Sequence, residues 1–170
     1  MERTLVLLKP DAVHRGLIGR IIARFEAKGL QIVGLKMRKF PVPLIKTHYG
    51  EHKGKPFYGD LVGFMTSGPV VALVLEGKDA VAVTRRLMGA TSSAKADPGT
   101  IRGDFGMSFS NNLVHGSDSK ASARRELALF FPDRSEINSW TPVTREWVYS
   151  GEELGAPVRK KTRKKAARKK

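Results

Sequence analysis

The chain has 170 residues, 41% of them hydrophobic, and no cysteine. This length suits one domain with a sizeable core, and the missing cysteine excludes disulfides, thiolate metal ligands and thiol catalysis. No apolar run approaches the roughly 20 residues of a membrane-spanning helix. Residues 4–9 already read as a strand, so we expect no signal peptide, no membrane contact and a cytoplasmic protein.

The formal net charge of +15 is concentrated in one segment. Residues 159–170, RKKTRKKAARKK, hold nine of the 31 basic residues and no acid, which leaves 22 basic against 16 acidic residues elsewhere. We expect a folded domain over 1–150 and a disordered basic tail over 151–170. The tail suits weak, salt-dependent binding to nucleic acid and a nuclear or nucleic-acid-associated fraction, and it equally suits a solvated tail or a localisation signal.

Strand-like and helix-like segments alternate along the domain. Apolar runs and alternation predict strands at residues 4–8, 31–40, 70–75 and around His115. Helical spacing of apolar residues predicts helices at residues 17–28, 43–53, 55–65, 79–88 and 119–130. This order predicts an α/β (α+β) fold, a ferredoxin-like βαββαβ sandwich in which helices cover one face of a four-stranded antiparallel sheet.

Residues 89–112 break this rhythm with Gly, Ser and an Asp-Pro-Gly turn. Irregular segments of about 24 residues inside a compact domain are usually functional or disordered. No GxxxxGK[ST] or GxGxxG motif occurs, so any phosphate must be held by side chains. Arg85, Thr91 and Arg102 are candidates, because guanidinium groups bind two phosphate oxygens at once. Taken singly, each arginine is as well explained by a solvated surface position.

Residues 111–119, NNLVHGSDS, deliver one histidine to a turn at a predicted helix start. An imidazole beside exposed backbone N–H groups suits a nucleophile that meets phosphate, and Ser117 or Ser119 could cap the helix. Glu126 on that helix could orient the His115 ring. The alternatives are a structural histidine and an ordinary charged helix surface.

Two more histidines and several aromatic residues lie earlier in the chain. His48 and His52 would share one face of a helix, as zinc ligands do, but no third ligand is evident. Tyr49 and Phe57 offer aromatic surface on which a base could stack, and core packing explains such residues equally well.

Five segments together resemble the nucleoside diphosphate kinase family: TLVLLKPDAV from Thr4, HY at His48-Tyr49, SGPVVALVLEG from Ser67, PGTIRGDF from Pro98, and NLVHGSDS from Asn112. The resemblance runs nearly colinearly over residues 2–147. It implies ping-pong transfer of a γ-phosphate from a nucleoside triphosphate to His115 and then to a nucleoside diphosphate, with low base specificity. It also implies Mg²⁺ as cofactor and a homo-hexamer, with a homo-tetramer as the alternative.

The resemblance further implies a role for each matched residue. Phosphates and ribose would be bound by Lys9, Arg85, Thr91, Arg102 and Asn112, and the base would stack on Phe57. Tyr49 and Lys9 would lie beside the His115 nucleophile, and Ser117 and Glu126 would position its ring. Mg²⁺ would be held mainly by the nucleotide phosphates, with no ligand from a protein side chain.

The sequence departs from the family pattern in several places. The pair Arg85-Arg86 stands where one basic residue is usual, so Arg86 is the alternative phosphate ligand. Phe109 stands where a smaller aliphatic side chain commonly contacts the base, and the basic tail is an addition. A relative without kinase activity, kept for its assembly, is a further alternative, which the complete set of matched residues argues against.

Overall fold

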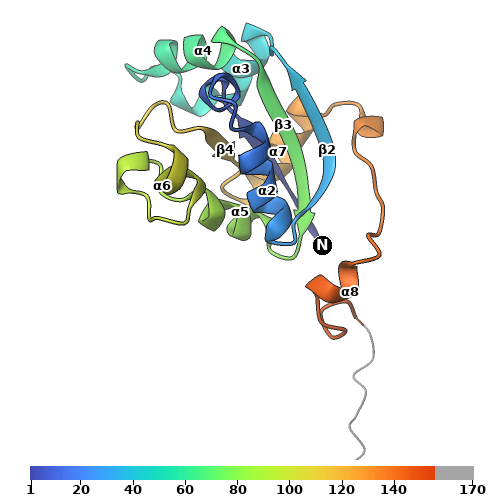
Figure 1. The fold of residues 1–170 in the computed structure, drawn as a ribbon. Helices are drawn as coiled ribbons and strands as arrows, with labels where there is room; N and C mark the ends of the chain where they lie inside the picture. Colours follow the sequence, from blue (N-terminus) through green and yellow to red (C-terminus); the bar gives the residue numbers. More distant parts are fainter. Residues whose placement is uncertain (156–170) are drawn as a thin grey trace, which may run out of the picture. The chain divides into compact units, whose positions relative to one another are not determined.

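The structure, a computed structural model, describes residues 1–155 (Figure 1). It divides into two compact units, Met1–Ser139 and Trp140–Lys170. All the candidate site residues belong to the first unit. The basic run at 159–170 lies outside the described residues, and the domain boundary at residue 150 stays a prediction.

The first unit is built on a four-stranded antiparallel sheet with strand order β2-β3-β1-β4. The strands are β1 (Glu2–Leu8), β2 (Gln31–Arg38), β3 (Val70–Gly77) and β4 (Val114–Gly116). β1 is central, and it pairs with β3 on one side and with the short β4 on the other. The predicted ferredoxin-like sheet and its four strands are confirmed.

Helices cover both faces of this sheet, so the prediction that they cover one face was wrong. Val6 and Leu8 of β1 face a core formed with α2 (Ile18–Ala27) and α5 (Ala80–Met88). Leu5 and Leu7 face the opposite core. That core includes residues of α3 (Val42–His48), α4 (Tyr58–Ser67) and α7 (Lys120–Phe130). Figure 1 shows α2 and α7 on opposite sides of the strands. Strands that are apolar at every position require cover on both faces.

Short helices refine the predicted boundaries. They are α1 (Pro10–His14), η1 (Gly50–His52), η2 (Ser93–Lys95), α6 (Ile101–Phe105), η3 (Arg134–Glu136) and α8 (Arg145–Val148). The segment predicted to be irregular therefore contains η2 and α6. Thr100 caps α6, because its Oγ1 accepts a hydrogen bond from the Gly103 N–H at 3.0 Å. Pro10 begins α1 two residues after the end of β1, at a position where its fixed φ and missing N–H are tolerated.

A serine cap fixes where α7 begins, and so where Glu126 lies. The Ser119 Oγ accepts a hydrogen bond from the Ser122 N–H at 3.1 Å, and the Ser122 Oγ accepts one from the Ser119 N–H at 2.9 Å. This reciprocal pair is a capping box. Of the two candidate caps, Ser119 is the one used, which leaves Ser117 free for another role.

Among the described residues, none of the helices combines the length and the hydropathy that crossing a bilayer would require.

Candidate active site

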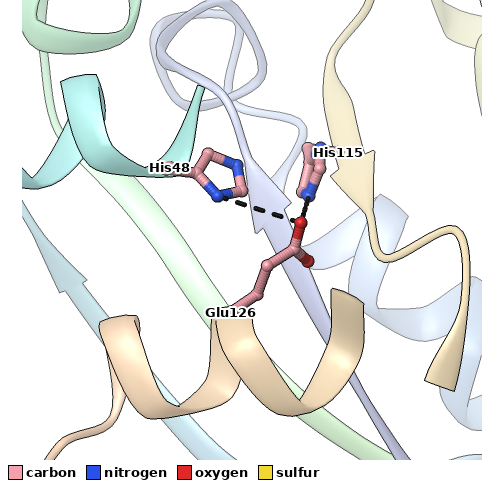
Figure 2. A group of neighbouring side chains, drawn as sticks. All are labelled: His48, His115 and Glu126. Carbon is pink, nitrogen blue, oxygen red and sulfur yellow. Dashed lines mark hydrogen bonds and ion pairs between the residues drawn. The ribbon is translucent and has the colours of Figure 1, made fainter. Parts of the chain in front are cut away.

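His115 and Glu126 form a hydrogen-bonded pair between β4 and α7 (Figure 2). The His115 Nε2 lies 3.2 Å from the Glu126 Oε1. The second carboxylate oxygen, Oε2, accepts a hydrogen bond from the Ser117 hydroxyl at 2.6 Å. The Ser117 Oγ in turn accepts the backbone N–H of Leu5 at 3.3 Å, so the carboxylate is tied to the central strand. Ser117 and Glu126 are both buried.

The charge state of Glu126 determines which nitrogen of His115 can react. Burial raises the pKa of this carboxyl, but the hydrogen bonds from His115 and Ser117 outweigh it and leave the pKa below its ordinary value. An ionised carboxylate only accepts hydrogen bonds, so in a neutral His115 ring the proton is on Nε2 and Nδ1 carries a lone pair. The His115 side chain is 21% exposed, which leaves the ring accessible to a substrate.

Lys9 and Asn112 lie together at the end of β1. The Lys9 Nζ donates to the Asn112 Oδ1 at 2.7 Å, and the Asn112 Nδ2 donates to the backbone oxygen of Thr91 at 2.9 Å. Burial, assisted by the charge of Arg102, lowers the pKa of Lys9 to about 8, although Asp11 opposes the shift. A buried ammonium of this kind gains from a bound anion, which supplies the missing charge compensation.

Arg102 connects the two ends of the segment that precedes β4. Its guanidinium donates to the backbone oxygens of Gly89 at 2.9 Å, Asn112 at 3.2 Å and Val114 at 2.7 Å. A guanidinium carries five N–H donors, so these three bonds leave two for a ligand. Burial, together with the charge of Arg85, lowers its pKa to about 10, so the group remains cationic at neutral pH.

The other predicted nucleotide contacts surround this group. The Arg85 Nη1 donates to the Gly116 oxygen, next to His115, at 3.4 Å, which favours Arg85 over Arg86 as the residue that reaches the site. The Tyr49 ring is 6.1 Å from the His115 ring. Its hydroxyl is buried, and burial raises the pKa of Tyr49.

Phe57 is connected to the same site by a series of rings. Tyr49 stacks on His52 at 6.1 Å between ring centroids, and His52 lies 5.5 Å from Phe57. Phe57 is 49% exposed, so its ring is available to a planar ligand. Tyr49 is a core residue, whereas Phe57 is not, so the two aromatic residues that the sequence left ambiguous have different environments.

Sequence reasoning missed the part played by Asp11 and Leu113. The Asp11 Oδ2 accepts the Leu113 N–H at 3.1 Å, and the Leu113 oxygen accepts the Lys9 N–H at 2.8 Å. These bonds hold Leu113 at φ 69°, a left-handed conformation that is strained for a bulky residue. The strained turn lies immediately before β4 and sets how Asn112 and His115 face the site. The only sequence signal was the motif containing Leu113.

His48 was missed in a different way. Its ring lies 4.6 Å from the His115 ring at an interplanar angle of 86°, and its Nδ1 is 3.9 Å from the Glu126 Oε1. The sequence paired it with His52 as a candidate zinc ligand, but α3 ends at His48 and His52 belongs to η1, so the two do not share one helix face.

Within residues 1–155, one group of side chains, His48, His115 and Glu126, has ligand atoms within 4.8 Å of one another, as a metal site would require. The hydrogen bond between His115 and Glu126 already accounts for two of its three members. The side chains of Lys9, Arg85 and Arg102 near this group are cationic, and they would repel a free metal ion. This donor set fits a metal that arrives on the phosphates of a nucleotide.

We predict that Lys9 makes the stability of the ligand-free protein depend on pH in the alkaline range. The pKa of Lys9 in the folded chain, about 8, is below the ordinary lysine value of 10.5. Between these values the unfolded chain holds a proton that the folded chain has lost, so stability rises with pH. The free energy of unfolding of the wild type minus that of Lys9→Met should increase by up to about 1.4 kcal/mol per pH unit above pH 8. Chemical denaturation at pH 7 to 9.5 measures this difference, and a flat difference would contradict it.

Comparison with known proteins places this site in a family. Residues 2–136 match the family described as nucleoside diphosphate kinase. The chain is 54% identical to the nucleoside diphosphate kinase of Carboxydothermus hydrogenoformans and 56% identical to that of Pelotomaculum thermopropionicum, in each case over 88% of this chain and 99% of the relative. A nucleoside diphosphate kinase of Halobacterium salinarum, solved in complex with CDP, superposes with a TM-score of 0.86 at 51% identity. That match covers 88% of this chain and 99% of the other. The chain therefore belongs to the nucleoside diphosphate kinase family.

Proposed function

We propose that His115 is the phosphate-accepting nucleophile of a nucleoside diphosphate kinase that works by a ping-pong mechanism. In the first half-reaction Nδ1 of His115 attacks the γ-phosphorus of a nucleoside triphosphate. A P–N bond forms, the bond from the γ-phosphorus to its bridging oxygen breaks, and the nucleoside diphosphate leaves. A second nucleoside diphosphate then takes the phosphoryl group from Nδ1 by the reverse process.

The observation that carries this proposal is the hydrogen-bonded series from Ser117 through Glu126 to His115 Nε2. It holds the proton on the nitrogen away from the substrate, so the lone pair on Nδ1 is free to attack. As the ring gains positive charge in the phosphorylated state, the ionised carboxylate stabilises it. Glu126 and Ser117 are thus the positioning residues, and Tyr49 closes the site beside the ring.

The cationic side chains bind the phosphates. Arg102 has two free donors, Arg85 lies beside the residue that follows His115, and the Lys9 ammonium gains an anionic partner when nucleotide binds. Asn112 and Thr91 border the same region, where the Asn112 Nδ2 donates a hydrogen bond to the backbone oxygen of Thr91. Kinases of this family generally need a divalent cation, and we propose Mg²⁺, which would be held mainly by the nucleotide phosphates and would neutralise part of their charge.

The base would stack on the exposed ring of Phe57. Stacking uses the aromatic face that every base offers and needs no hydrogen-bond pattern, so this contact agrees with low base specificity. Substrates are therefore nucleoside di- and triphosphates of several bases. A cytoplasmic location remains a prediction.

We predict that γ-labelled ATP gives an acid-labile phosphoenzyme in the wild type and in His14→Ala, and none in His115→Ala. His14 is the matched control, because it is an exposed histidine at the end of α1. Gel autoradiography with and without acid treatment measures the label, and addition of unlabelled nucleoside diphosphate should remove it. Label that persists in His115→Ala would contradict the assignment of the nucleophile.

We also propose that the chain assembles into a homo-oligomer, a hexamer with a tetramer as the alternative. β2 is an edge strand of the sheet, and it exposes two large apolar side chains, Leu35 at 54% and Met37 at 57%. Exposed apolar side chains on an edge strand favour pairing with another chain. Light scattering should find six or four chains in the wild type and a smaller particle in Leu35→Asp/Met37→Asp. A wild-type monomer would contradict the proposal.

The basic run at 159–170 supports a further, independent property, weak binding to nucleic acid. Nine cations could give a slope of log affinity against log salt of up to about −8 on duplex DNA. Deletion of residues 156–170 should abolish this binding and leave phosphotransfer intact. Unchanged DNA affinity after the deletion would exclude the tail as the binding element.

A further inference from the structure

His48 lies at the centre of the active site, yet the mechanism above gives it no role. Its side chain is 1% exposed and packs against the rings of His115, Tyr49 and Phe130, with centroids 4.6, 4.3 and 5.0 Å away. Neither ring nitrogen has a hydrogen-bond partner within residues 1–155. A buried imidazole without partners is unusual, because buried polar atoms in proteins are nearly always hydrogen-bonded.

The polar group nearest to this ring is the Glu126 carboxylate. The His48 Nδ1 is 3.9 Å from the Glu126 Oε1, the same oxygen that faces His115 Nε2 at 3.2 Å. Figure 2 shows the two imidazoles side by side above this one oxygen, His48 from the end of α3 and His115 from β4. A shift of less than an ångström would bring His48 Nδ1 from 3.9 Å to within hydrogen-bond range.

The surroundings keep this ring neutral. Burial is the main cause that lowers the pKa of His48 to about 3, and the charge of His115 adds to it. Glu126 acts in the opposite direction, while Arg125 and Lys9 lower the pKa further. A neutral imidazole has one N–H, and the carboxylate favours that proton on Nδ1. A cationic His48 would compete with His115 for the carboxylate, whereas a neutral one supports it as a second, weaker donor.

We propose that His48 is a positioning residue of phosphotransfer, a neutral ring that packs against His115 and directs an Nδ1–H at the Glu126 oxygen that accepts the His115 proton. This inference rests on the proposed function. The donor keeps the carboxylate ionised and aligned while His115 is unphosphorylated. When the phosphoryl group adds positive charge to the His115 ring, the carboxylate is already oriented toward it.

Two substitutions separate the donor from the ring. His48→Phe keeps an aromatic ring and removes the donor, whereas His48→Asn places an amide N–H close to the position of Nδ1 and removes the ring. Phe130→Leu is the packing control, because the Phe130 ring contacts the His48 ring and carries no polar atom that could bind the Glu126 carboxylate. The readout is the pH dependence of the rate of phosphoenzyme formation between pH 5 and 8.

Loss of a hydrogen bond to a charged group should lower the His48→Phe rate at pH 6 about tenfold and move its acid limb up by about one pH unit. His48→Asn and Phe130→Leu should keep the wild-type acid limb. The other charged or titratable groups around the pair, Lys9, Tyr49, Arg102, His115 and Arg125, are the same in all variants. A wild-type limb in His48→Phe, or equal shifts in all three variants, would reduce His48 to a packing residue.

A measurement on the wild type covers the case in which a variant fails to fold. The ¹⁵N chemical shifts of His48 should report a neutral ring with the proton on Nδ1 throughout pH 5 to 8. A proton on Nε2, or titration in this range, overturns the proposal. Failure of the proposed function would appear differently, as label that does not depend on His115, so the two outcomes can be told apart.

Discussion

The site depends on the two hydrogen bonds that the buried Glu126 carboxylate accepts, from Ser117 and from His115. They join three parts of the chain: α7, the short strand β4 and, through the Ser117 contact with Leu5, the central strand β1. The capping box fixes where α7 begins and so where Glu126 lies. The antiparallel pairing of β1 with β4 fixes where His115 lies. The geometry of the candidate site is therefore fixed by the same contacts that hold α7 against the sheet.

The phosphate-binding groups are held at some cost to stability. Lys9 and Arg102 are buried cations with lowered pKa values, and Leu113 is kept in a left-handed conformation by Asp11 and Lys9. Arg102 uses three donors to hold the loop ends before any ligand arrives. Strained backbone and buried charges without full compensation are typical of binding sites. A bound anion would compensate the positive charges of Lys9 and Arg102. The donors of Lys9 and Arg102 are thus oriented before any ligand binds, and in the proposed function the nucleotide phosphates would supply the missing negative charge.

The sequence predicted the sheet better than it predicted the contacts that support the candidate site. Unbroken apolar runs identified β1 and β3, but burial on both faces followed only when the helices on each side were known. His115 and Ser117 were proposed from one short motif and Glu126 from the helix that follows it, with the family resemblance supporting all three, and their roles stay predictions. The contacts of Asp11, Leu113 and His48 were not predicted. They join residues about 70 to 100 positions apart, and they depend on strand register and on the end of α3. The carbonyl contacts of Arg102 span only 10 to 13 positions, but they depend on how the segment between α5 and β4 folds, and that segment has no regular sequence pattern.

The most direct test of this account is the position of the phosphoryl group on the His115 ring. The phosphoenzyme can be prepared with a nucleoside triphosphate and its ³¹P spectrum compared with those of the two phosphohistidine isomers. Because Glu126 holds the proton on Nε2, the account requires phosphate on Nδ1. Phosphate on Nε2 would mean that the pair of His115 and Glu126 is broken when the enzyme reacts, and it would contradict the account.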